Sequence, residues 1–172
     1  MKETLQDLKN RRSCRNYQST QIKDEELNAI LEAGTYAPTG MGMQSPIMVV
    51  VQDKETIDLM SKLNAKVMGT DSDPFYGAPT VIIVLADTSR PTYLEDGSLV
   101  MGNLMNAAHA VGVDSCWIHR AKEVFQMPEG KALLKKWGIS DNYVGIGNCV
   151  LGYAAGPLAE AKPRKEGYII RV

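Results

Sequence analysis

Apolar residues are distributed along the chain in two patterns. Short, mostly apolar runs predict strands at residues 47–51, 80–86, 114–118 and 143–153. Apolar residues three or four positions apart predict helices near 5–8 and over 24–37, 53–65, 93–110 and 128–137. The run 47–51 has no polar alternation, which predicts a strand buried on both faces. At 172 residues, the chain suits one domain.

Residues 154–172 follow neither pattern, because glycines and prolines interrupt any helical period. A segment of this kind is usually a disordered tail. It nevertheless ends in Tyr168-Ile169-Ile170-Arg171-Val172, which is apolar enough to require burial. We therefore expect a single domain over residues 1–172 in which residues 154–172 form an extended arm.

Charge and cysteine content exclude several classes of protein. The formal net charge is -1 and the pI is about 6.1, so the chain lacks the basic field of a nucleic-acid-binding protein. Cys14, Cys116 and Cys149 are widely spaced, which argues against a disulfide framework and against a zinc site, and favours a reducing cytoplasm. No apolar run approaches the roughly 18 residues that a membrane span requires.

The predicted helix 93–110 carries two notable groups of residues. Leu99, Asn103, Ala107 and Ala110 form a face suited to tight packing, either in the core or across a dimer interface. The acidic pair Glu95-Asp96 lies in the first turn, where negative charge favours the helix dipole. We prefer that interpretation to a catalytic carboxylate pair.

A cluster of basic residues follows the first helical segment. Arg11, Arg12 and Arg15 place three guanidinium groups within five residues, and Ser13 adds a hydroxyl group. Arginine binds phosphate through paired hydrogen bonds and stays charged at physiological pH. The cluster is thus either a phosphate site or a solvated basic turn. A second basic stretch, residues 162–165, lies near the C-terminus.

The loop after the helix 24–37 contains glycines and methionines. Gly40 and Gly42 permit the backbone to approach a flat ligand closely, although the loop is equally explained as a flexible connection. Met41 and Met43 are flexible and polarizable, and they suit either a pocket that accepts different flat molecules or the protein core.

Taken together, these stretches resemble the nitroreductase family of flavoproteins, which bind FMN. The residues that match the family pattern are Arg11, Ser13 and Arg15, then Pro38, Thr39 and Gln44, then Asn64, and finally Lys162 and Arg164. Their order and spacing hold over nearly the whole chain. The sequence departs from the family pattern at Gly42, where an Asn is common, and at Ser45-Pro46, where Pro-Trp is common.

The resemblance implies an α+β fold with a central, mainly antiparallel sheet flanked by helices. It also implies a homodimer in which the C-terminal arm is exchanged with the partner subunit. We expect two FMN sites at the dimer interface, each built from both chains.

The resemblance further implies which residues hold the cofactor. Expected around the FMN phosphate and ribityl chain are Arg11, Ser13, Arg15 and Arg164, with Arg12 in the same cluster. Lys162 is expected near the pyrimidine edge, where positive charge stabilises reduced flavin. Pro38, Thr39 and Gly40 belong to the cofactor-binding loop.

The flavin ring is expected to be held by side-chain amides and by backbone N–H groups. Gln44 and Asn64 would bond polar atoms of the ring and ribityl chain, although Asn64 also suits a helix-capping role. Backbone amides at Ile118, His119 and Arg120 would lie near N5. We assign His119 a main-chain role.

By this resemblance the protein is an oxidoreductase in which FMN, rather than a side chain, performs the redox step. NADH or NADPH would pass a hydride to N5, leave, and be replaced by a nitroaromatic, quinone or similar flat acceptor in a ping-pong cycle. Met41 and Met43 would line the shared pocket.

Alternatives remain open at this point. On the same fold, the protein could be a flavin reductase, an enone or dehalogenating reductase, or a flavin-destroying enzyme. It could also be a non-catalytic FMN store or sensor, or a cofactor-free domain whose arginines bind an acidic partner.

Overall fold

The structure is a computed structural model that describes residues 2–172. Its helices are α1 (Glu3–Asn10), α2 (Asp24–Thr35), α3 (Lys54–Met68), α4 (Tyr93–Ala110), α5 (Ala121–Gln126) and α6 (Pro128–Lys136). Its strands are β1 (Ile47–Val51), β2 (Thr80–Asp87), β3 (Asp114–Ile118) and β4 (Tyr143–Gly152). The four predicted strands are confirmed, whereas the short helix α5 and the 3₁₀ helix η1 (Gly40–Gly42) are elements that the apolar pattern did not predict.

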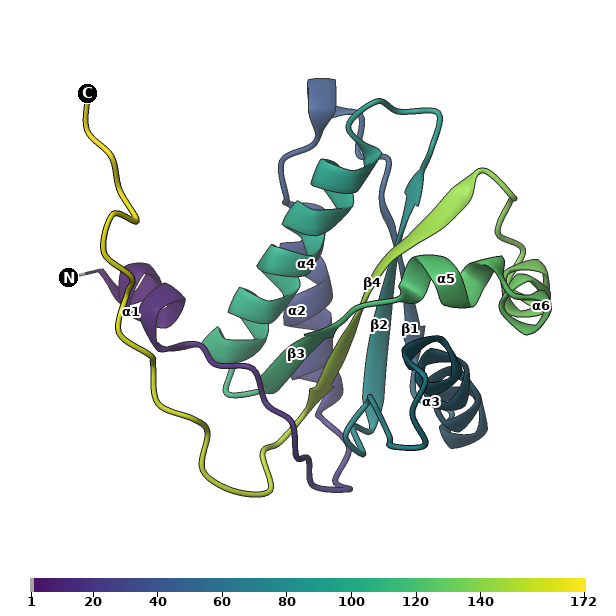
Figure 1. The fold of residues 1–172 in the computed structure, drawn as a ribbon, viewed down its shortest axis with the longest axis horizontal. Helices are drawn as coiled ribbons and strands as arrows, with labels where there is room; N and C mark the ends of the chain where they lie inside the picture. The colour runs from purple at the N-terminus through teal and green to yellow at the C-terminus, as the bar shows by residue number, and fades with distance from the viewer. Residues whose placement is uncertain (1) are drawn as a thin grey trace.

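One sheet forms the centre of the molecule, with the strand order β1-β2-β4-β3 and antiparallel pairing throughout. Helices flank this sheet, as Figure 1 shows, so the predicted α+β class is confirmed. The prediction that the strand at 47–51 is buried on both faces is wrong. β1 lies at an edge of the sheet, and its residues are mostly half-buried, with Val50 exposed.

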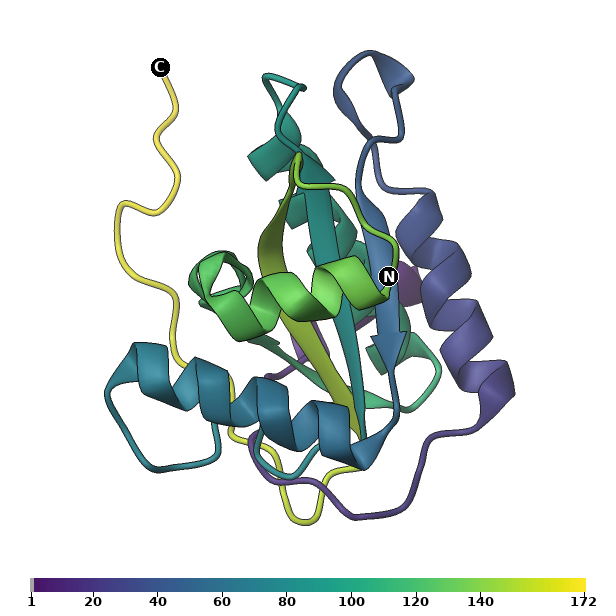
Figure 2. The same cartoon turned by 90° about the vertical axis from the view of Figure 1, so that its right-hand side faces the viewer.

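The side chains of β2 alternate between two apolar layers, as expected for a strand covered on both faces. Val81, Ile83 and Leu85 pack in a cluster with residues of α3, α5 and α6. Ile82 and Val84 pack in a second cluster with residues of α2 and α4. Figures 1 and 2 show the two groups of helices on opposite sides of the sheet.

The helix α3 has clear signals at both ends. The Asp53 carboxylate accepts a hydrogen bond from the Thr56 N–H at 2.9 Å, and its bonds to Thr56 lower the pKa of Asp53. Gly69, with φ of 74°, ends the helix in the left-handed conformation. The helix therefore runs three residues beyond the predicted end at 65.

The small-residue face of α4 is only partly buried within the chain. The residues of α4 that are buried are Asp96, Gly97, Val100, Met101, Leu104 and Ala108. Leu99 is 46% exposed, and Ala110 is also exposed. Ala107 packs against the second apolar cluster, and Asn103 Nδ2 donates to the Ala33 carbonyl of α2 at 2.9 Å, so these two residues pack within the chain. For the exposed residues Leu99 and Ala110, the dimer interface stays a prediction.

The last residues extend away from the sheet without helix or strand. Almost every side chain from Gly156 onward is exposed, including Ile169 at 77% and Ile170 at 82%. The arm overlaps α1 in Figure 1, but Figure 2 shows the two lying apart. No helix within residues 2–172 combines the length and apolar composition needed to cross a bilayer.

Helix α6 packs so tightly on α5 that one position tolerates no side chain. A Cβ added to Gly130 would lie 2.0 Å from the carbonyl oxygen of Val124, a backbone atom that cannot rotate away. Gly130→Ala should therefore reduce the free energy of unfolding by about 1–3 kcal/mol, although alanine normally stabilises a helix. Urea denaturation followed by circular dichroism measures this change.

Glu129→Ala is the matched control, because Glu129 is the exposed neighbour in the same helical turn. Its effect should stay within about 0.5 kcal/mol. A stabilising Gly130→Ala substitution would contradict the close approach of the two helices.

Candidate functional site

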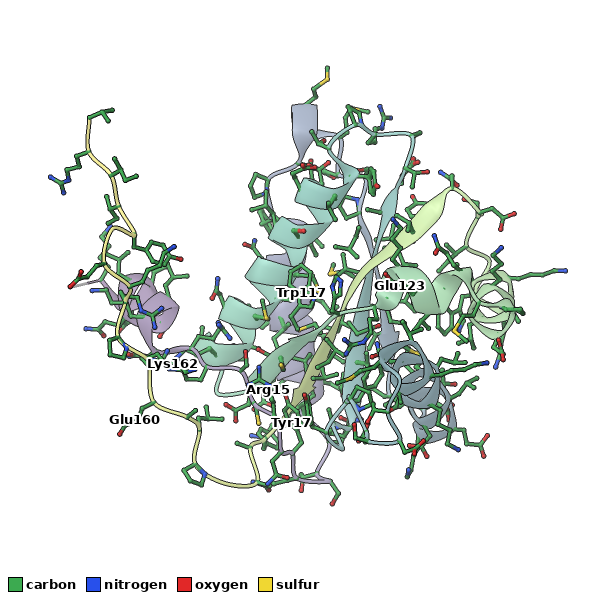
Figure 3. The ribbon with its side chains drawn as sticks, viewed as in Figure 1. Arg15, Tyr17, Trp117, Glu123, Glu160 and Lys162 are labelled. Carbon is green, nitrogen blue, oxygen red and sulfur yellow. The ribbon has the colours of Figure 1, made fainter. Side chains whose placement is uncertain are left out.

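The arginine cluster lies along the outer edge of β3. Ser13 forms an isolated parallel bridge with Ser115, and the Cys14 N–H donates to the Ser115 carbonyl at 3.0 Å. Farther along, Tyr17 bridges to Ala154, just beyond β4. Figure 3 shows Arg15 and Tyr17 beside the ends of these strands. The sheet therefore fixes where the basic segment lies.

The arginines of the cluster have different environments. Arg12 donates from Nη1 to the carbonyls of Lys9 and Arg11, both at 2.7 Å, and so closes the end of α1. Arg15 is exposed. Arg11 carries a buried Nη1 atom for which residues 2–172 supply no hydrogen-bond acceptor. A buried donor without an acceptor is costly, so Arg11 is suited to bind an anion brought from outside the chain.

The cluster converges on Cys116 in β3. Burial raises the pKa of the Cys116 thiol, while the charges of Arg15 and Arg11 and a hydrogen bond with Ser13 oppose that shift. Burial also raises the pKa of Cys149 to about 12. Burial thus favours the protonated form of both thiols, and neither Cys116 nor Cys149 is set up as a thiolate nucleophile.

Asn64 is fully buried and joins α3 to the end of β3. Its Nδ2 donates to the His119 carbonyl at 2.8 Å, and its Oδ1 accepts from Arg120 Nε at 3.0 Å. Because α3 continues to Met68, the helix-capping alternative for Asn64 is wrong. Arg120 has a φ of 73°, and both contacts hold this strained turn in place.

The loop over residues 38–44 is tightly constrained. Met41, Gly42 and Gln44 all have positive φ, between 51° and 66°. Within the loop, Thr39 Oγ1 accepts from the Gln44 N–H at 2.9 Å. Met41 is 96% exposed and Met43 is 45% exposed, so the alternative that these methionines fill the core is wrong.

The side chain of Asp96 ties this loop to α4. Asp96 is only 3% exposed, and its carboxylate accepts from the Gly40 N–H at 2.9 Å and from Thr92 Oγ1 at 3.1 Å. The sequence pattern suggested that Asp96 merely favours the helix dipole. Its role in the structure is a specific contact between positions 56 residues apart.

The chain brings together only part of the predicted site. Gathered along and beyond β3 are Arg11, Ser13, Arg15, Asn64, Ile118, His119 and Arg120. A loop at the N-terminal end of α4 holds Pro38, Thr39, Gly40 and Gln44, whereas β3 begins near the C-terminal end of α4, as Figure 1 shows. The two halves of the predicted site are thus separate within one chain.

The basic residues of the arm form a third group. Arg164 donates from Nε to the Lys162 carbonyl at 3.2 Å, and Figure 3 shows Lys162 on the extended arm. Within residues 2–172, neither side chain contacts the arginine cluster through a hydrogen bond or an ion pair. Lys162 and Arg164 are therefore not joined to Arg11 in the single chain.

A groove of about 840 Å³ lies elsewhere, between α3 and the loop 70–79. None of the predicted cofactor-binding residues lines it. Residues 2–172 also contain no group of three or more His, Cys, Asp and Glu side chains placed to hold a metal ion. The buried Nη1 donor of Arg11 therefore lies outside this groove, on the surface along β3.

The sequence pattern missed two buried polar side chains in the sheet. Asn148 Oδ1 and Ser115 Oγ are buried and have no hydrogen-bond partner among the described residues. Asn148 also lies opposite Ile118 in the β3–β4 pairing. For each residue, the available signal was its polar side chain inside an apolar run, at 143–153 for Asn148 and at 114–118 for Ser115.

Comparisons with known proteins place these features in context. The model of the nitroreductase family matches residues 8–153. A protein of Archaeoglobus fulgidus, named as a proposed NADH dehydrogenase/NAD(P)H nitroreductase, is 32% identical over 158 residues, which cover 89% of this chain and 86% of the relative.

Two crystal structures of nitroreductases with bound FMN are also similar. The protein from Bacteroides fragilis has a TM-score of 0.92 and 31% identity, with all of both chains covered. The protein from Desulfitobacterium hafniense has a TM-score of 0.89 and 27% identity, with 100% of this chain and 99% of the other covered.

The contacts of Asn64 predict a measurable loss of stability. Asn64→Ala leaves the Arg120 Nε donor and the His119 carbonyl without their partner, which should cost about 1–3 kcal/mol of unfolding free energy. Thermal and urea denaturation measure the loss. Lys62→Ala, at an exposed position of the same helix, should change stability by less than about 0.5 kcal/mol. Equal stability of the two variants would show that the Asn64 contacts do not form.

Proposed function

The chain belongs to the nitroreductase family, and from this premise we propose that it is an FMN-dependent oxidoreductase with NADH or NADPH as electron donor. Two similar structures contain FMN, and a relative carries a name that refers to NAD(P)H. These likenesses extend over most or all of the chain, so they support a shared cofactor rather than a shared local motif.

The observation that carries the proposal is the buried Nη1 of Arg11. A phosphate oxygen is the acceptor that this guanidinium group lacks, and Ser13 and Arg15 adjoin the same part of β3. Arg12 is already engaged at the end of α1, so we assign it a supporting role rather than a direct phosphate contact.

The turn after β3 suits the flavin ring. Asn64 holds His119 and Arg120, and the backbone of residues 118–120 is the proposed partner of the ring near N5. Because both polar ends of the Asn64 amide are engaged, Asn64 acts in this proposal by fixing the turn. Lys162 and Arg164 would add positive charge near FMN once the arm packs against the partner subunit of the dimer.

When bound, FMN would supply the redox chemistry, which is hydride transfer from NAD(P)H to a nitroaromatic, quinone or similar flat acceptor in a ping-pong cycle. The chain contributes binding and orientation. Arg11, Ser13 and Arg15 anchor one end of the cofactor, while the turn 118–120 orients the other. The exposed side chains of Met41 and Met43 offer an adaptable apolar wall for more than one flat substrate.

We also propose a homodimer, because the single chain leaves its site incomplete. The loop 38–44 and the β3 surface lie at different ends of one chain, so each loop would serve the site of the partner. Exposed apolar side chains on several elements would be covered in such a dimer; among them are Leu5, Leu8, Leu99, Met41, Ile169 and Ile170.

A spectrum of the purified protein tests cofactor binding directly. We expect a yellow protein with flavin absorbance near about 450 nm, and rapid bleaching when NADH or NADPH is added without oxygen, because hydride transfer reduces the ring. Stopped-flow absorbance records the rate. A yellow protein that does not bleach would be an FMN store, and a colourless protein that takes up no added FMN would refute the proposal.

Removing the Arg11 guanidinium tests the phosphate site. Arg11→Ala should weaken FMN binding by about 1.5–3 kcal/mol, the range for hydrogen bonds to charged groups, as measured by fluorescence titration of the apoprotein. Arg90→Ala, in the turn before α4, is the control and should leave the affinity unchanged. Unchanged FMN affinity in Arg11→Ala would mean that the phosphate lies elsewhere.

The proposed dimer has a clear signature in solution. Sedimentation equilibrium should give about twice the chain mass of 18.9 kDa. A chain ending at residue 155 should lose FMN together with much of the dimer, because it lacks Lys162, Arg164 and the apolar end. A monodisperse monomer of the full chain that retains one FMN per chain would contradict the shared site.

A further inference from the structure

The loop 38–44 presents a large apolar side chain to solvent on a rigid support. The side chain of Met41 is 96% exposed. The backbone of Met41, Gly42 and Gln44 adopts positive φ values, which are unusual for Met41 and Gln44 because neither is a glycine. Flexible loops relax such conformations, so their persistence requires contacts that hold the loop. Met41 itself does not supply them, because its side chain packs on nothing in its own chain.

The contact that fixes the loop from outside comes from Asp96. Among the described residues, its carboxylate makes the only hydrogen bond that joins loop 38–44 to a distant element. The other bonds of the loop, from Gly42 and Met43 to Thr39 and Gly40 and from Gln44 to Thr39, are local.

The approach of the loop to α4 is also unusually close. A Cβ on Gly40 would lie 2.3 Å from Thr92 Oγ1, and Thr92 in turn donates to Asp96. Asp96 is 3% exposed, yet no cation pairs with it among the described residues. Burying a carboxylate without a cation costs free energy, and the hydrogen bonds from Gly40 and Thr92 offset this cost, so the buried carboxylate depends on its contact with the loop.

We propose that Asp96 is a positioning residue that holds Met41 as a wall of the acceptor pocket and thereby sets the ring size of acceptors that react. This inference rests on the proposed function, in which the loop serves the flavin site of the partner. It deepens that function, because it names the group that determines acceptor preference. Glu95, the adjacent carboxylate, is exposed, and among residues 2–172 it has no side-chain hydrogen bond or ion pair with the loop.

The test compares two quinones of different size, 1,4-benzoquinone and 1,4-naphthoquinone, at saturating NADH. The measured quantity is the ratio of kcat/KM for the two acceptors. Asp96→Ala should change this ratio at least threefold, because Met41 no longer occupies a fixed position. Asp96→Asn should restore the wild-type ratio, since its amide can accept from the Gly40 N–H and donate to Thr92 Oγ1. Glu95→Ala should leave the ratio unchanged.

A double-substitution cycle separates positioning from general loss of structure. Met41→Ala should change the ratio in the same direction, and adding Asp96→Ala should change it no further, because both substitutions remove the same wall. The inference is wrong if the change of the ratio in the double variant equals the product of the changes in the two single variants. It is also wrong if Asp96→Ala changes the ratio less than threefold.

A third variant keeps the test valid if Asp96→Ala fails to fold. Gly40 is half-buried and lies outside the core, so Gly40→Ala should displace the loop from α4 and produce the same change in the ratio. Its failure to do so would equally overturn the inference. The wild-type protein distinguishes failure of the proposed function from failure of this inference. A colourless or unbleached wild type refutes the proposed function. An active wild type with unaffected variants refutes only the role of Asp96.

Discussion

The candidate site depends on the pairing of the N-terminal segment with β3. Three guanidinium groups within five residues repel one another, so the segment needs an anchor to hold them together. Cys14 and Tyr17 provide it, because both are buried and the Tyr17 hydroxyl donates to the Cys14 carbonyl at 3.0 Å. The backbone bond from Cys14 to Ser115 then fixes this anchor to the sheet. The charged side chains at 11 and 15 are therefore positioned by the burial of Cys14 and Tyr17 in the same segment.

Much of the fold follows from the apolar pattern alone. Continuous runs such as 80–86 can be satisfied only by a strand with helices on both faces, and the run predicts β2 nearly residue for residue. The same reasoning fails for β1, because a run of apolar residues such as Val and Met has the same sequence pattern in a central strand as in an edge strand. Which strand lies at the edge depends on pairing between residues far apart, such as Val49 with Ile83.

The site was predicted less completely, for a similar reason. Residue type and order were enough to propose Arg11, Ser13 and Arg15 as a candidate phosphate-binding group, which stays a prediction. They could not show that Arg12 closes α1, since this depends on where the helix ends. Nor could they show that Asn64 joins α3 to the turn after β3, or that Asp96 joins α4 to the loop 38–44. Each of these contacts links residues more than fifty positions apart. Such contacts exist only once the helices have packed.

The edge position of β1 has a consequence for handling the protein. Its outer backbone groups have no strand partner among the described residues, and its sequence Ile-Met-Val-Val-Val carries no charge to discourage pairing. An uncharged, apolar edge is a template for aggregation. The opposite edge, β3, is shielded by the segment around Ser13. Concentrated samples are therefore most vulnerable to intermolecular association at one side of the sheet, and a lysine at exposed Val50 is the natural place to suppress it.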